Sequence, residues 1–207
     1  MTENPPASPN GPASSPAIRV VSTAEEMRVL GRSLASVLRA GDLVILSGGL
    51  GAGKTTLTQG IGDGLDVRGP VTSPTFVIAR VHPPLAGSAG GARHLGGAGG
   101  SSPPLVHVDA YRLGSALELD DLDLDTDTAS SVTVVEWGEG LAEGLSADRL
   151  EITITLKAPE APDLDRPGIL GDPDDEGADM PRIVRIHPVG ERWEGIKLPL
   201  AGLADRL

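Results

Sequence analysis

One segment of the chain has the residue types and spacing of a phosphate-binding loop. Residues 48–55 read GGLGAGKT, which matches the pattern G-x-x-x-x-G-K-[ST]. The glycines let successive backbone N–H groups point toward phosphate oxygens, and a helix beginning at Lys54 would add its positive N-terminal end. Lys54 would reach the β- and γ-phosphates, the Thr55 hydroxyl would bind Mg²⁺, and Thr56 would bind the α-phosphate. The segment therefore predicts nucleotide binding.

Two carboxylates end short apolar runs further along the chain. Asp109 ends LVHVD (105–109), and Glu136 ends VTVVE (132–136). A P-loop enzyme needs an acidic residue at the end of a neighbouring strand to hold its metal ion, directly or through water. Because parallel strands finish at the same edge of a sheet, we expect both carboxylates to reach Mg²⁺ or the attacking water.

The segment TSPTF (72–76) carries hydroxyls at three of its first four positions and is stiffened by Pro74. This composition suits a loop that senses the γ-phosphate and metal, although a simple turn entering a strand is the alternative. Trp137 follows Glu136 directly, and the scarcity of aromatic residues favours a place for it in the core. His107 lies in the middle of its expected strand and is interpreted as structural.

The elements that must position these groups follow an α/β pattern. Ser22 with Glu25 predicts a helix start near Thr23, and the apolar spacing carries that helix to Gly41. Residues 43–46 (LVIL) predict a strand buried on both faces, and residues 54–65 a second helix. Further strands are expected, in chain order, at 18–21, 75–81, 105–109, 132–136, 150–156 and 182–187.

These elements predict a P-loop NTPase-like α/β fold of three layers, with a mixed sheet that is parallel at its centre and has antiparallel edge strands. Glycine and proline number 28 and 18 of 207 residues, an excess typical of low-complexity segments around an ordinary core. We therefore expect a disordered tail at 1–16 and one domain at 17–207, with inserts at 83–104 and 158–181.

Composition and charge exclude several classes of protein. Without cysteine there can be no disulfide, thiol catalysis or Cys-ligated zinc. No apolar run approaches the roughly 20 residues of a membrane span, and residues 1–16 lack the features of a secretory signal, so a cytoplasmic protein is expected. The net charge is −12 and is concentrated in residues 115–127 and 158–181, which disfavours direct binding of nucleic acid.

Four motifs in this order resemble the TsaE (YjeE) family: GGLGAGKTT (48–56), TSPTF (72–76), HVDAYRL (107–113) and VEWGE (135–139). A Walker A motif alone is common, but its combination with the other three is specific. The resemblance implies a cytoplasmic P-loop ATPase that binds ATP and Mg²⁺ and hydrolyses ATP slowly. Such a protein is needed for threonylcarbamoyl modification of adenosine 37 in tRNAs that read codons beginning with A. It would act on the TsaB–TsaD pair and meet tRNA only through that complex.

The resemblance also implies roles for individual residues. Thr55 and Glu136 would bind Mg²⁺, Asp109 would organise the metal or the hydrolytic water, and Lys54 would act with both carboxylates in catalysis. The remaining nucleotide contacts would come from Thr23, Gly51, Ala52, Gly53, Thr56, Trp137 and, with a less secure alignment, Arg182.

Three other functions are alternatives to an ATPase of tRNA modification. A free-standing small-molecule phosphotransferase is the main alternative, but such enzymes usually bring lid arginines over the phosphates, and the insert at 83–104 has only Arg93. A GTP-dependent switch lacks the N-K-x-D motif that reads guanine. A nucleotide-gated binding module with negligible turnover can be separated from an ATPase only by kinetics.

Overall fold

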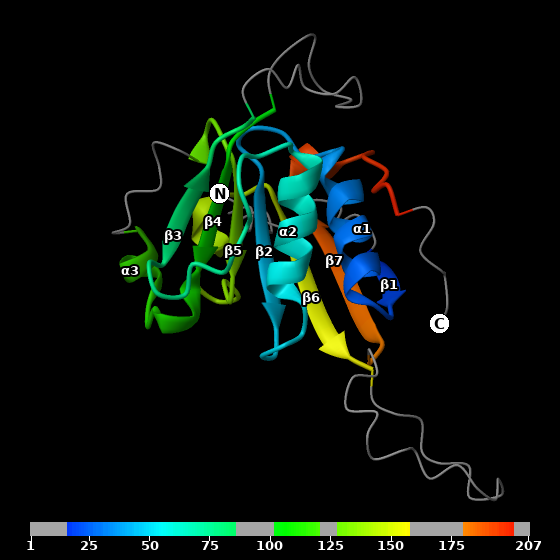
Figure 1. The fold of residues 1–207 in the computed structure, drawn as a ribbon. Coiled ribbons are helices and arrows are strands. Elements are labelled where there is room, and N and C mark those ends of the chain that lie inside the picture. Colours follow the sequence, from blue (N-terminus) through cyan, green and yellow to red (C-terminus); the bar gives the residue numbers. More distant parts are fainter. Residues whose placement is uncertain (1–15, 86–101, 121–127, 158–179, 201–207) are drawn as a thin grey trace, which may run out of the picture.

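The computed structural model describes residues 16–85, 102–120, 128–157 and 180–200. Within these ranges one mixed sheet has the strand order β1-β7-β6-β2-β5-β4-β3 (Figure 1). Its strands are β1 (Ala17–Val21), β2 (Leu43–Gly48), β3 (Ala79–His82), β4 (Leu105–Asp109), β5 (Val132–Glu136), β6 (Arg149–Leu156) and β7 (Arg182–Val189). The four central strands are parallel, and β1, β7 and β3 pair antiparallel. The predicted mixed α/β sheet is confirmed.

Helices α1 (Ala24–Ala35) and α2 (Lys54–Gly64) cover one face of the sheet (Figure 1). They bury a large apolar cluster that includes Leu30 and Leu57. A smaller cluster on the other face is closed by Leu119 of the short helix α3 (Ala116–Asp120) and by Ala142. The sheet is therefore the middle of three layers, and the layer containing α3 is thin in the described part of the chain.

The start of α1 differs by one residue from the predicted capping pair. Thr23 is the N-cap, and its Oγ1 accepts a hydrogen bond from the Glu26 N–H at 3.1 Å. The Glu26 carboxylate accepts from the Ser22 N–H at 2.6 Å, so Glu26 takes the part expected of Glu25. A hydroxyl and a carboxylate three residues apart still begin the helix.

Two predicted boundaries were wrong. Helix α1 ends at Ala35 rather than Gly41, because the N–H groups of Ser36 and Val37 bond three residues back and tighten the last turn. The strand expected at 75–81 is the shorter β3, because the Val77 and Ile78 N–H groups both bond the carbonyl of Pro74 and form a turn.

Other sequence expectations fall partly beyond the described residues. The predicted tail and two inserts lie mostly there, as does the second half of the acidic run at 115–127. The division into a tail and one domain with inserts thus stays a prediction. None of the helices in the described ranges has the length and apolar character needed to cross a membrane.

Helices α1 and α2 approach closely through glycines. A Cβ atom at Gly60 of α2 would overlap the carbonyl oxygen of Arg28, and one at Gly31 of α1 would overlap that of Leu57. Both overlaps are with backbone, which a rotamer change cannot relieve. The glycines therefore fix how closely α2, which begins at Lys54, lies against α1.

We predict that Gly60→Ala lowers the free energy of unfolding by roughly 1–3 kcal/mol, because the added methyl group must push two helices apart. At an open helical position the same change would be stabilising by up to about 1 kcal/mol, so the sign of the effect is informative. Gly144 is exposed and a Cβ there meets nothing within 4 Å. Chemical denaturation of Gly60→Ala, with Gly144→Ala as control, measures the difference; equal stability of the two variants would contradict this packing.

Candidate functional site

The glycine-rich loop lies between β2 and α2, as its sequence predicts. Gly48, Gly51 and Gly53 have φ angles of +144°, +72° and +109°, which favour glycine. A side chain at Gly48 would also collide with the carbonyl of Ile154 in the neighbouring β6. The first turn of α2 has no acidic residue, so the N–H groups at its start remain available to an anion.

Lys54 folds back across this loop. Its Nζ donates to the carbonyl oxygens of Gly48 and Gly49, each at 2.9 Å, and lies 3.5 Å from the centre of the Trp137 ring. Burial lowers the pKa of Lys54, while the nearby carboxylates of Glu136 and Asp109 oppose that shift. Lys54 therefore lies across the site, where two backbone carbonyls and an aromatic ring contact its ammonium group. A phosphate group would have to take the place of the carbonyl bonds.

Glu136 is buried at the end of β5 and is held from two sides. The Thr55 hydroxyl of α2 donates to Glu136 Oε2 at 3.0 Å. On the other oxygen, Oε1, the Thr58 hydroxyl lies at 3.4 Å and His107 Nε2 at 2.8 Å. The structure therefore brings together Thr55 and Glu136, the two residues that the sequence suggests as metal ligands.

Asp109, at the end of β4, holds the TSPTF loop. Its Oδ2 accepts from the hydroxyls of Ser73 at 2.9 Å and Thr75 at 2.6 Å, and its Oδ1 accepts from the Tyr111 N–H at 3.1 Å. Ile78, just after the loop, has a φ angle of +66°, which is unfavourable for a β-branched residue. The loop is therefore constrained at both ends, by the carboxylate and by the start of β3.

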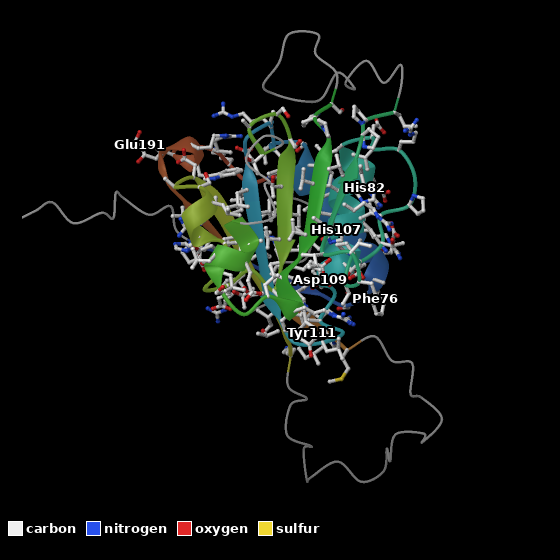
Figure 2. All side chains as sticks on the ribbon, turned by 90° about the vertical axis from the view of Figure 1, so that its left-hand side faces the viewer. Phe76, His82, His107, Asp109, Tyr111 and Glu191 are labelled. Carbon is white, nitrogen blue, oxygen red and sulfur yellow. The ribbon has the colours of Figure 1, made fainter. Side chains whose placement is uncertain are left out.

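These groups converge on one open cavity of about 410 Å³, a size typical of small-molecule sites. Its lining residues come from the loop, α2 and the ends of β4 and β5: Leu50, Gly51, Ala52, Gly53, Lys54, Thr55, Thr56, Ser73, Thr75, Asp109, Tyr111, Glu136 and Trp137. In Figure 2, His107 and Asp109 follow one another along β4 toward this edge, Tyr111 lies in the turn after the strand, and Phe76 lies beside them.

Trp137 is half-buried in the cavity wall rather than in the core that the composition favours. It has a φ angle of +62°, and its N–H bonds the carbonyl of Leu46 at 2.8 Å. Its ring lies 5.1 Å from that of Tyr111. This backbone conformation turns the ring out of the sheet and under Lys54.

Two predicted nucleotide contacts lie outside the cavity lining. Thr23 uses its hydroxyl to cap α1. Arg182 packs against the loop, since a Cβ at Gly53 would lie 3.8 Å from its Nε, and this buried Nε has no hydrogen-bond partner within the described part of the chain. Its Nη1 donates to the carbonyl of Met180 at 3.0 Å.

Two residues at the site were not expected from the sequence. Thr58 lies one helical turn below Lys54 and faces Glu136. His107 was interpreted as structural, yet it bonds the carboxylate of Glu136. Alternation along a strand would have indicated it, because His107 and Asp109 are two residues apart and share one face of β4.

A glycine-rich loop between a buried parallel strand and a helix, facing two strand-end carboxylates, defines a P-loop-like α/β protein. The family model for the threonylcarbamoyl adenosine biosynthesis protein TsaE matches residues 21–163. The chain belongs to the TsaE family.

Individual relatives agree with this assignment. The chain is 55% identical over 168 residues to the tRNA threonylcarbamoyladenosine biosynthesis protein TsaE of Streptomyces coelicolor, covering 81% of this chain and 93% of the relative. The TsaE protein of Bacillus subtilis is 34% identical over 131 residues, which cover 63% of this chain and 72% of the relative. The crystal structure of YdiB, also from a Bacillus, matches with a TM-score of 0.56 and 27% identity, covering 87% of this chain and 90% of YdiB.

We predict that Asp109→Ala frees the TSPTF loop, because Ser73 and Thr75 lose their shared acceptor. Hydrogen exchange followed by mass spectrometry should show faster exchange in a peptide covering residues 72–80, while a peptide covering β5 keeps its protection. Unchanged exchange in residues 72–80 would contradict the view that Asp109 holds the loop.

Proposed function

We propose that this protein binds ATP, hydrolyses it slowly, and is required by a TsaB–TsaD complex for threonylcarbamoyl modification of adenosine 37 in tRNAs reading codons that begin with A. Family membership supports the pathway. The observation that supports ATP chemistry is the meeting of Lys54, Thr55, Asp109 and Glu136 in one cavity beside the N-terminus of α2.

The loop and α2 are suited to a triphosphate. Backbone N–H groups from Gly51 to Thr56 would surround the phosphate oxygens. The Lys54 ammonium would exchange its bonds with the carbonyls of Gly48 and Gly49 for charge-assisted bonds to phosphate. Trp137 would lie beside the nucleotide, and Arg182 would supply a further contact if its guanidinium turned away from Met180.

The oxygen atoms of Thr55 and Glu136 suit the coordination of a magnesium ion. They are a hydroxyl and a carboxylate oxygen 3.0 Å apart, and Mg²⁺ prefers hard oxygen ligands with waters and phosphate completing its shell. When bound, the ion would neutralise charge that develops on the phosphates. Asp109 would then orient the attacking water through Oδ2, the oxygen that now accepts hydrogen bonds from Ser73 and Thr75.

The hydrogen bonds that Asp109 already accepts give a physical reason why the protein alone would hydrolyse ATP slowly. Three hydrogen bonds hold its carboxylate, and those donors belong to the loop and to the residues after β4. Phe76, at the tip of that loop, is 87% exposed although it is a large apolar side chain. A partner that binds Phe76 and moves the loop would release Asp109 for catalysis.

The acidic character of the chain is consistent with this arrangement. With a net charge of −12, the protein would repel a phosphate backbone. We therefore propose that it contacts TsaB and TsaD in the cytoplasm and meets tRNA only through their complex.

We predict that Lys54→Ala abolishes ATP binding, because the phosphates lose their buried counter-charge. Glu136→Ala should retain ATP binding but lose most hydrolysis, because the metal loses a ligand. Isothermal titration and a phosphate-release assay measure the two effects separately. Lys197→Ala is the matched control, since Lys197 is exposed, follows β7 in the chain and is not among the residues that line the cavity. Equal hydrolysis by Glu136→Ala and wild type would remove Glu136 from the mechanism.

A further inference from the structure

His107 is a fully buried imidazole that bonds the carboxylate of Glu136. It lies on β4, whose residues pair in parallel with those of β5, so that Asp109 is opposite Glu136 and His107 is opposite Val134. His107 therefore lies two residues before Asp109 on β4, on the same face of the sheet, which α2 covers. Its Nε2 comes within 2.8 Å of Glu136 Oε1. Because a carboxylate only accepts, this nitrogen carries the hydrogen.

The two oxygens of Glu136 have different surroundings. Oε1 faces His107 and Thr58 in the buried layer, at 2.8 and 3.4 Å. Oε2 faces Thr55 at the cavity, at 3.0 Å. The short bond from His107 thus fixes the rotation of the carboxylate so that one oxygen points into the cavity.

Packing alone does not account for a histidine at this position. Its other ring nitrogen, Nδ1, is buried without a hydrogen-bond partner among the described residues, and such a group costs about 1–3 kcal/mol. An apolar residue of similar volume would fill the same space without that cost. What the histidine adds is a donor aimed at Glu136.

We propose that His107 is a positioning residue, which holds Glu136 Oε1 so that Oε2 is presented to the magnesium ion. The inference rests on the proposed metal-binding role of Glu136. Removal of a hydrogen-bond donor that orients a metal ligand typically lowers metal affinity by roughly 10–100-fold.

Two amide variants separate the hydrogen bond from packing. In His107→Gln the amide nitrogen can take the place of Nε2, whereas in His107→Asn the side chain is too short to reach Glu136. His82→Asn is the matched control, because His82 is another buried histidine whose ring centre is 6.5 Å from that of His107, yet the bonds of Glu136 go to Thr55, Thr58 and His107.

The measurement is the Mg²⁺ concentration that half-saturates the complex of each folded variant with a non-hydrolysable ATP analogue, together with analogue affinity in EDTA. We expect His107→Asn to raise this concentration roughly tenfold with unchanged affinity in EDTA, and His107→Gln and His82→Asn to stay within about twofold of wild type. Equal behaviour of the Asn and Gln variants, or the same loss in His82→Asn, would overturn the positioning role. Absence of any Mg²⁺ effect in wild type would instead overturn the proposed metal site itself.

Discussion

The site depends on a buried carboxylate. Glu136 is only 2% exposed, and a charge removed from water to this degree is stable only when donors and counter-charges surround it. Thr55 and Thr58 provide hydroxyls from α2, His107 provides an imidazole from β4, and the Lys54 ammonium lies nearby. These groups therefore tie α2 and β4 to the end of β5.

The parallel register of the central strands makes this arrangement possible. In the sheet, Glu136 is the Cα partner of both Leu46 on β2 and Asp109 on β4. The loop after β2 and the two carboxylates consequently reach one edge, although they are far apart in the sequence. The close approach of α1 and α2 through Gly31 and Gly60 then covers the face of the sheet on which His107 lies, and Thr58 of α2 faces Glu136.

The elements that carry strong local signals could be predicted from the sequence. The loop at 48–55 and the strand ends at Asp109 and Glu136 lie where pattern and parallel topology place them. Residues 72–76 were expected to form a loop or a turn, but the extension of the turn to Ile78 was not expected. It is set by backbone bonds to Pro74 and by the bonds of Asp109 to the loop, which form only in the folded chain. Strand alternation places His107 on the face of Asp109, but its bond to Glu136 also depends on the pairing of β4 with β5. The place of Trp137 depends on a positive φ angle, which spacing does not reveal.

The most direct measurement is threonylcarbamoyladenosine formation over many turnovers, in a reaction with TsaB, TsaD, tRNA and threonylcarbamoyl-adenylate. This protein would be absent, wild type, or Lys54→Ala. The proposed function predicts that product beyond one turnover of TsaD requires both the wild-type protein and ATP, and that Lys54→Ala gives the yield seen without the protein. An equal yield in all three reactions would contradict it.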